Sequence, residues 1–348
     1  MIKETVYVIH KNGVYSHHLG LKYLLHKNHI ALKYREFSIF SKLFRSIAKG
    51  KLGLAKKQVI NLLFFISLLF SKNKKVVLGI APYDIKLAVL LFFLKTHSVY
   101  YHTSWTCWDK SFQPKKIKSQ KILRIWKFFL EKKVKHIFAV TNVSKQAILS
   151  NYRVSEKSIS VVFHSIDSAF SKQNSTQKTK NSFVYYGRLV RQKGIDELLA
   201  FFKEHQKATI TFIGDGKETE KIRKVSKEYK NIALLPYLRN KKELQKVIAS
   251  FQYLIMNSIK TSKWEELFGM AIIEGMSQGL IPIATNHSGP KEIISLETGY
   301  LCDEGGMSAA LKNIIMTNPN NQKKVENCKK TASEYTINKI SEKWKAIL

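Results

Sequence analysis

The sequence predicts an α/β protein built from two doubly wound, Rossmann-like domains, and three observations support this fold class. The chain has 348 residues, which is enough for two domains at roughly 100 to 200 residues each. It is 45% hydrophobic and 24% charged, the composition of an ordinary folded protein, which excludes a disordered chain, a collagen-like rod and a disulfide miniprotein. Apolar runs of strand length alternate with helical patterns throughout, and this alternation is typical of parallel sheets made of βαβ units.

The N-terminal half carries six apolar runs of strand length with helical patterns between them. We expect strands near residues 4–10, 29–36, 74–80, 97–103, 136–141 and 159–165, and helices near 17–27, 84–95, 117–134 and 144–151. The first run lacks the long apolar core of a signal peptide, and the three cysteines form no CxxC spacing. We therefore expect a protein of the reducing cytoplasm without a disulfide framework or a zinc site.

A polar segment, SKQNSTQKTKN at residues 171–181, lacks large apolar side chains and is expected to connect two domains, residues 1–170 and 182–335. The same alternation of strands and helices resumes after it. Ligands of such sheets bind beyond the carboxyl ends of the strands, so candidate sites are sought there.

The formal net charge of +34 predicts an anionic partner or surface, and residues 1–180 hold 33 basic and 7 acidic side chains. The apolar run at 59–70 has lysines on both sides. Twelve residues are fewer than the roughly 20 that span a bilayer as a helix, so this run is either a core helix or an interfacial helix on an anionic leaflet. Residues 117–134 leave the same two alternatives open.

The first candidate site is the sequence GRLVRQKG, which follows the strand-like run SFVYY. Gly187 permits a tight exit from the strand, and Gly194 opens the next helix. Arg188 and Lys193 are placed to meet phosphate oxygens, arginine in a bidentate manner and lysine as a point charge. The alternative is a pair of surface charges, but the position at a strand end favours a phosphate site.

The second candidate is IGDG, which follows the strand-like run TITF. Gly214 supplies flexible backbone, and Asp215 is a candidate contact to an anion or a base. A plain turn explains this segment equally well.

The third and strongest candidate is EELFGMAIIEGM, which runs from a loop into an apolar helix. On one continuous helix, Glu266 and Glu274 would lie about 80° apart around the axis and about 12 Å apart along it, too far to share a ligand group. If Gly269 opens the helix, Glu266 lies in the loop, and the helix N-terminus favours a phosphate. Glu274 would then accept hydrogen bonds from a vicinal diol. Its apolar neighbours require a partner if it is buried, whereas the alternative is a helix cap and a solvated glutamate.

Residues 183–305 resemble the nucleotide-sugar-binding half of the GT-B retaining glycosyltransferases of family four, the glycosyl transferases group 1. The Glu-x7-Glu pattern, the GRLxxxKG strand exit, IGDG and GPxE at 289–292 occur in the family's order. The resemblance implies a GT-B fold, in which two Rossmann-like domains face each other across a cleft. It also implies that backbone amides near Phe268 and Gly269 complete a phosphate site.

The resemblance further assigns roles to four charged side chains. Arg188 and Lys193 hold the donor diphosphate, Glu274 binds the ribose hydroxyls, and Glu266 contacts hydroxyls of the donor sugar. Together with the helix N-terminus, the two cations would neutralise the leaving diphosphate without a metal or another cofactor. No DxD motif indicates a metal, and the family favours front-face substitution in which the leaving phosphate helps to deprotonate the acceptor.

The N-terminal half resembles the family more weakly. The Asn-Gly pair ending at Gly13 resembles the glycine-rich loop of the family, with one glycine where two are common. His102, at the end of SVYYHT, stands where members carry a histidine that contacts the transferred sugar, and a structural histidine is the alternative. Residues 161–170 resemble the connection into the second domain, and residues 336–348 resemble a terminal helix that packs back on the first domain.

The resemblance implies a retaining hexosyltransferase that uses a nucleotide-diphosphate sugar, with UDP-sugars favoured, and a glycan or lipid-linked glycan acceptor. The basic N-terminal half indicates a peripheral location on the anionic inner face of the cell membrane. Bacterial capsule, O-antigen or lipopolysaccharide synthesis is the expected pathway. The alternatives are another GT-B enzyme, such as a nucleotide-sugar epimerase, and a nucleic-acid-binding protein. Nucleic acid is not expected, because the chain resembles no known nucleic-acid reading module.

Overall fold

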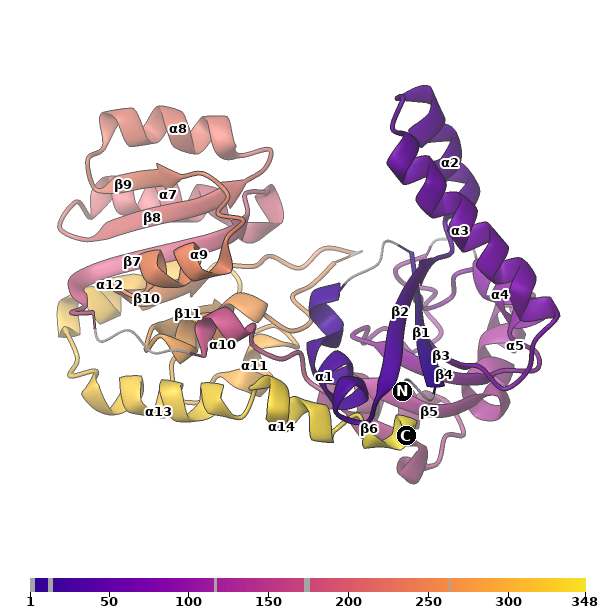
Figure 1. Cartoon of the computed structure of the whole chain (residues 1–348). Coiled ribbons are helices and arrows are strands. Elements are labelled where there is room, and N and C mark those ends of the chain that lie inside the picture. The colour runs from indigo at the N-terminus through magenta and orange to yellow at the C-terminus, as the bar shows by residue number, and fades with distance from the viewer. Residues whose placement is uncertain (1–3, 12–14, 116–117, 172–175, 263) are drawn as a thin grey trace. The chain divides into compact units, whose positions relative to one another are not determined.

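The computed structural model describes residues 4–11, 15–115, 118–171, 176–262 and 264–348 of the chain. The chain divides into two compact units, and we call Met1–Ser165 with Asn338–Leu348 unit 1, and Ile166–Ile337 unit 2. Each unit contains a six-stranded sheet in which all paired strands are parallel (Figure 1). The predicted fold class, two doubly wound α/β units, is confirmed.

The sheet of unit 1 has the strand order β2-β1-β3-β4-β5-β6. Its strands are β1 (Glu4–His10), β2 (Ile30–Glu36), β3 (Lys75–Gly79), β4 (Ser98–Thr103), β5 (Val134–Ala139) and β6 (Ile159–Val161). Its helices are α1 (Leu19–Lys27), α2 (Ile39–Ala48), α3 (Leu52–Leu69), α4 (Lys86–Phe93), α5 (Gln120–Phe128) and α6 (Asn142–Asn151), joined near the end of the chain by α14 (Ile337–Glu342). The order reverses between β1 and β3, which makes the carboxyl ends of these strands the expected ligand position.

Alternation of apolar residues along the strands of unit 1 gives the sheet two buried faces. Val6 and Val8 of β1 pack with α1 and the C-terminal segment on one face, whereas Ile9 packs on the other face with α3, α4 and α5. Trp344 anchors the C-terminal segment, because it is 1% exposed and its ring centroid lies 4.4 Å from that of Phe138.

The apolar run at 59–70 is part of a longer helix than the sequence predicted. α3 begins at Leu52 and has 18 residues, and α2, which was not predicted, packs beside it. By length and composition alone, α3 is the one helix among the described residues that could cross a membrane, although part of it is buried in unit 1. One side of α3 faces the core and the other faces outward. Within the segment 117–134, Ile122 and Trp126 of α5 are buried, so one side of this helix packs in the core of unit 1, while an interfacial role for its exposed side stays a prediction.

The sheet of unit 2 has the order β12-β11-β10-β7-β8-β9. Its strands are β7 (Thr179–Arg188), β8 (Thr209–Asp215), β9 (Ile232–Leu235), β10 (Phe251–Met256), β11 (Ile281–Thr285) and β12 (Tyr300–Cys302). Its helices are α7 (Ile195–Glu204), α8 (Thr219–Glu228), α9 (Lys241–Ile248), α10 (Met270–Ser277), α11 (Pro290–Ile293), α12 (Met307–Thr317) and α13 (Gln322–Ser333). β7 begins inside the segment 171–181 that was expected to be a connection. The order reverses between β7 and β10, so a ligand is expected beyond their carboxyl ends.

Two glycines allow the chain to pack closely at this edge of the sheet. Gly214 has φ +155°, and a Cβ there would lie 1.9 Å from the carbonyl oxygen of Gly187 on the neighbouring strand. Gly194 has φ +60°, and a Cβ there would lie 2.4 Å from Asn257. Both positions therefore require glycine, for conformation and for space.

Candidate functional site

A buried cation and a carboxylate meet beyond the ends of β7 and β10. The Lys193 ammonium forms an ion pair with Glu266 and lies 3.3 Å from the Ser258 hydroxyl oxygen. It also lies 4.7 Å from the centroid of the Trp264 ring, on which a cation is favoured. The side chains of Lys193 and Glu266 are 11% and 15% exposed, so this charge is held in place by three neighbours while part of it still reaches solvent.

The loop that carries Glu266 is fixed by backbone and histidine contacts. The Glu266 N–H donates to Nδ1 of His287 at 3.2 Å, and Nε2 of the same ring donates to the Ser258 carbonyl at 2.9 Å. The Gly289 N–H donates to the Glu266 carbonyl, and a Cβ at Gly289 would lie 2.3 Å from the backbone of Phe268. Gly289, the glycine of the GPxE motif, therefore supports the loop that carries Glu266. This loop precedes helix α10, so Glu266 lies outside the helix.

Helix α10 begins directly after this loop. Gly269, at φ +99°, is its N-cap, and the buried Phe268 precedes it. Free N–H groups of the first helical turn are therefore present next to the Glu266 loop, as the sequence predicted for a phosphate site.

Arg188 ends β7 beside Asp215, which ends β8. The Arg188 side chain is exposed, and among the described residues no ion pair engages it. The Asp215 carboxylate accepts hydrogen bonds from the Gly216 N–H and from the Thr219 hydroxyl, at 2.7 and 3.1 Å. Asp215 thus caps a turn, whereas Arg188 is open to an anion.

Glu274 lies in a separate small pocket of unit 2. The pocket has a volume of about 210 Å³ and is lined by Tyr186, Gly187, Ile213, Tyr237, Leu238, Lys241, Leu244, Met270, Ala271 and Glu274. Glu274 is 3% exposed, and Lys241 donates to its Oε1 at 2.8 Å. Burial raises the pKa of Glu274 above its ordinary value, and Lys241 opposes that shift. The sequence predicted that a buried Glu274 needs a partner, but it did not identify Lys241.

His102 lines a pocket of about 360 Å³ in unit 1, beyond the carboxyl ends of β1, β3 and β4. Four more histidines line the same pocket: His10, His17, His18 and His164. The ring centroid of His102 lies 4.9 Å from that of His18 and 5.1 Å from that of Trp344. Nε2 of His102 is buried and has no hydrogen-bond partner among the described residues, so the hydrogen-bonding capacity of this ring is not used within the described part of the fold.

The surroundings of this pocket lower the pKa of four of its five histidines. Burial lowers the pKa of His17 to about 4, and the nearby His10 ring adds to the effect. Burial also brings the pKa of His102 and of His164 well below the ordinary value, with further lowering from the other imidazoles. Glu36, near the pocket, stays charged, because hydrogen bonds from Lys57 and Lys42 outweigh burial and lower its pKa to about 2.

We expect the free energy of unfolding to fall as the pH is lowered from about 6.5 towards 4. The unfolded chain protonates its histidines below their ordinary pKa, whereas the folded pocket does not, so protons favour the unfolded state in this window. The loss should exceed about 1.4 kcal/mol, the value of one pKa unit. Denaturant unfolding at several pH values measures it. His17→Gln should reduce the change in unfolding free energy with pH, whereas His26→Gln, at an exposed position, should not. An unfolding free energy that does not change between about pH 6.5 and 4 would contradict the neutral pocket.

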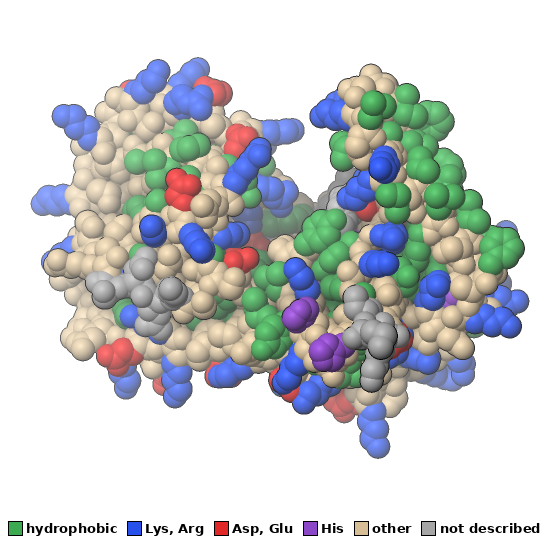
Figure 2. Space-filling view, in the orientation of Figure 1, with side chains coloured by type: hydrophobic (Ala, Val, Ile, Leu, Met, Phe, Trp, Pro, Cys, Tyr) green, Lys and Arg blue, Asp and Glu red, His purple; other side chains and the backbone are tan. Residues whose placement is uncertain are grey.

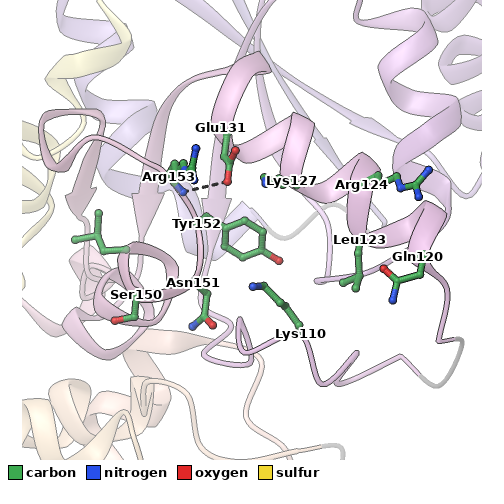
Figure 3. A pocket seen from close by; sticks show the side chains of 11 residues that line it. Lys110, Gln120, Leu123, Arg124, Lys127, Glu131, Ser150, Asn151, Tyr152 and Arg153 are labelled. Carbon is green, nitrogen blue, oxygen red and sulfur yellow. Dashed lines mark hydrogen bonds between the residues drawn. The ribbon is translucent and has the colours of Figure 1, made fainter.

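A third depression lies elsewhere in unit 1 and is strongly basic (Figure 3). It has a volume of about 580 Å³ and includes the cations Lys110, Arg124, Lys127 and Arg153. Glu131 is its one carboxylate, and the Arg153 N–H donates to it at 3.1 Å (Figure 3). No residue that the sequence predicted for catalysis or donor binding lies here, and its cations are exposed, so we assign it no part in catalysis.

The structure brings several predicted residues together and leaves others apart. Lys193, Glu266 and the start of α10 lie at one end of the unit 2 sheet, whereas His102 belongs to unit 1 and Gly13 lies outside the described residues. The sequence did not single out Ser258, Trp264, Lys241, His287, His10, His17, His18 or His164. Position is the signal that could have found Ser258 and His10, because they lie at the ends of strands that flank a reversal of strand order.

Comparison with known proteins defines the class of protein. Residues 167–335, nearly half of the chain, match the family described as Glycosyl transferases group 1. A Klebsiella pneumoniae protein described as an uncharacterized 41.2 kDa protein in the cps region is 33% identical over 125 residues. That alignment covers 35% of this chain and 32% of the relative, so the chain matches about a third of the relative's length.

Solved structures share the whole fold at low identity. Anabaena HepE in complex with UDP has a TM-score of 0.68 at 14% identity and covers 98% of both chains. The lipopolysaccharide outer core galactosyltransferase WaaB has a TM-score of 0.63 at 17% identity, with 99% of this chain and 98% of that chain covered. A mutant of S. aureus TarM, solved in complex with UDP and other ligands, has a TM-score of 0.61 at 17% identity, and the match covers 84% of this chain and 59% of the TarM chain. The fold is therefore that of the GT-B glycosyltransferases.

Proposed function

We propose that this protein is a retaining glycosyltransferase that moves a sugar from a nucleotide-diphosphate sugar to a glycan or lipid-linked glycan acceptor. The observation that carries this proposal is the largely buried ion pair of Lys193 and Glu266 at the point where the strand order of unit 2 reverses. Arg188 and the N-terminus of α10 belong to the same end of the sheet. This combination suits a diphosphate and a sugar hydroxyl side by side.

The chemistry follows from the charge that each group stabilises. Lys193, Arg188 and the free N–H groups of α10 would neutralise the negative charge that develops on the departing diphosphate. Because fixed cations and amides supply this charge, we propose that transfer requires no metal or other cofactor. The Glu266 carboxylate would accept hydrogen bonds from the donor sugar, and Glu274 would accept them from the ribose diol.

Unit 1 supplies the proposed contact to the transferred sugar. His102 lines a pocket, its buried Nε2 has no hydrogen-bond partner among the described residues, and its neutral ring can donate or accept one hydrogen bond. A neutral imidazole suits a sugar hydroxyl, because burying a charged ring in this pocket would cost desolvation free energy, whereas a neutral ring exchanges one hydrogen bond with the hydroxyl. The pocket of His102 is therefore our candidate for the site that binds the acceptor.

We propose bacterial surface polysaccharide synthesis, such as that of capsule, O-antigen or lipopolysaccharide, at the cytoplasmic face of the cell membrane. The relative from a cps region and the fold shared with WaaB support the pathway. Structures of HepE and TarM that hold UDP support a UDP-sugar as donor. The basic surface of the N-terminal half supports the location.

The test begins with nucleotide binding, because it requires no acceptor. Thermal unfolding with UDP, GDP, ADP, CMP and dTDP should show stabilisation by one nucleotide, worth roughly 2.7 kcal/mol at 100 times its dissociation constant.

Sugar transfer is tested next. Nucleotide sugars of the stabilising nucleotide are incubated with lipid-linked glycan fractions in the presence of EDTA, and the anomeric configuration of the product is determined from NMR couplings. An α-donor should give an α-product. Release of an epimerised sugar without acceptor would favour an epimerase, and no response to any nucleotide would overturn the proposal.

A further inference from the structure

Three neighbouring helices of unit 1 expose large apolar side chains to solvent. Phe44 of α2, Leu63 of α3 and Phe92 of α4 are 71%, 60% and 67% exposed. The exposed apolar positions recur every three or four residues on α2, from Ile60 to Leu69 of α3, and from Ile85 to Phe92, which places them on one side of each helix there. We call the exposed apolar side chains from Phe40 to Phe92 the apolar face. Figure 2 shows hydrophobic side chains gathered over the part of unit 1 that contains α2, α3 and α4, with basic side chains among them.

The apolar face is not an unfinished part of the core. The opposite side of α3 is already packed, since Phe64, Phe65 and Leu68 are buried in the core of unit 1. The same is true of α4, whose Leu87 and Leu90 are buried. Each helix therefore has an inner apolar side that stabilises the fold and an outer one that the fold does not use, which marks a surface for another partner.

Polar contacts hold α3 against unit 1. Gln58 of α3 is buried and donates to Oε2 of Glu36 at 3.0 Å, and Lys57 forms an ion pair with the same carboxylate at 2.8 Å. Asn61 accepts a hydrogen bond from the Glu36 N–H at 3.3 Å. A helix that crossed a bilayer would have to break these contacts and carry their polar groups into hydrocarbon. The contacts favour a helix that lies on a membrane surface.

The charge of the same segment selects an anionic partner. Residues 37–83 contain nine basic side chains and no acidic one. A second copy of this chain would bring the two basic surfaces together, and their repulsion opposes such a dimer. Anionic lipid head groups attract lysines that flank an apolar surface, while the apolar side chains enter the acyl boundary. Apolarity and charge together therefore favour an anionic bilayer.

The histidine-lined pocket opens where two of these helices start. Phe37, just before α2, and Asp84, just before α4, both line the pocket. The Lys86 ammonium at the start of α4 lies over the Phe37 ring, 5.8 Å from its centroid. This contact links the N-terminal ends of α2 and α4. A surface formed by α2 and α4 is thus continuous with the rim of the pocket that contains His102.

We propose that α2, α3 and α4 insert the apolar face into an anionic leaflet and thereby present the histidine-lined pocket to an acceptor anchored in the same leaflet. The second part of this inference rests on the proposed function, whereas the first part does not. The acceptor would then be reached by diffusion in the membrane plane, and a lipid anchor would lie beside the pocket rim.

Vesicle binding by the full chain tests the inference without any donor or acceptor. Co-sedimentation is measured with phosphatidylcholine vesicles that contain or lack phosphatidylglycerol. We expect binding to the anionic vesicles only, weakened by salt, and a loss of at least about tenfold in partitioning for Phe44→Ser/Phe92→Ser. A matched control, Leu296→Ser/Met316→Ser, alters side chains of unit 2 that are 91% and 73% exposed and should bind like the unaltered chain.

Further measurements distinguish the possible outcomes. Stabilisation by nucleotide should be the same in the apolar-face variant and the unaltered chain, so loss of vesicle binding would not reflect misfolding or a failed donor site. Equal vesicle binding by both double variants would overturn the inference. A dimer in sedimentation velocity that Phe44→Ser/Phe92→Ser converts to a monomer, without any vesicle binding, would also overturn it and assign the face to self-association.

Discussion

Lys193→Met should lower the rate of sugar transfer by about 10²- to 10³-fold, the usual cost of removing one group that stabilises developing negative charge. Methionine keeps an unbranched chain over the Trp264 ring but removes the ammonium that contacts Glu266 and Ser258. Because Lys193 is held by three neighbours before a donor arrives, little reorganisation is required on binding. The measurement is kcat/KM with the nucleotide sugar that the native protein uses.

Two further variants separate electrostatic catalysis from stability. Arg191→Met removes an exposed cation of the same segment and should leave kcat/KM within about twofold of the native value. Lys193→Arg should restore only part of the lost rate, because guanidinium is larger and the site is nearly closed. If Lys193→Met has the same Tm as the native protein and also transfers sugar at the native rate, Lys193 has no catalytic role. If it merely fails to fold, the role of the ion pair is structural.

The prediction from sequence succeeded for the fold, because strand-length apolar runs identified both sheets. The segment after SFVYY pointed to Lys193, and the loop-to-helix motif EELFGMAIIEGM pointed to Glu266 and Glu274; the structure places Lys193 and Glu266 in contact and buries Glu274 in α10, while their roles stay predictions. Ser258, His287 and Lys241 could not be recognised in the same way. They are remote in sequence from the side chains they contact, and nothing in their local sequence indicates those contacts.

Helix α2 shows why the apolar face was only partly predicted. Its sequence, IFSKLFRSIA, has helical periodicity, but Phe40, Phe44 and Ile47 are exposed to solvent, and no helix was predicted here. Periodicity identifies which side of a helix is apolar, and it does not say whether a core or another partner covers that side. The same limit applies to the histidine-lined pocket, because the five rings come from segments as distant as His10 and His164.

Glu274→Gln should weaken nucleotide binding by about 10- to 100-fold, because a hydrogen bond to a charged group is worth about 1.5–3 kcal/mol. The Glu274 carboxylate is buried, and one oxygen is engaged by Lys241, so the ribose diol would supply the missing partners. Glutamine preserves the shape of the pocket but replaces one acceptor oxygen with a donor. Isothermal titration with the nucleotide that stabilises the native protein gives the affinity directly.

The same substitution should leave the free energy of unfolding unchanged or raise it. Burying a carboxylate costs desolvation free energy, and the Lys241 side chain, 43% exposed, can turn to water once its partner is neutral. Glu228→Gln, at an exposed position of α8, is the control for loss of a charge in unit 2. Native affinity in Glu274→Gln would exclude the ribose contact. If both the stability and the nucleotide affinity fall, the carboxylate maintains the structure of the pocket. A site built to bind a diol predicts weaker nucleotide binding in a protein that is at least as stable as the native one.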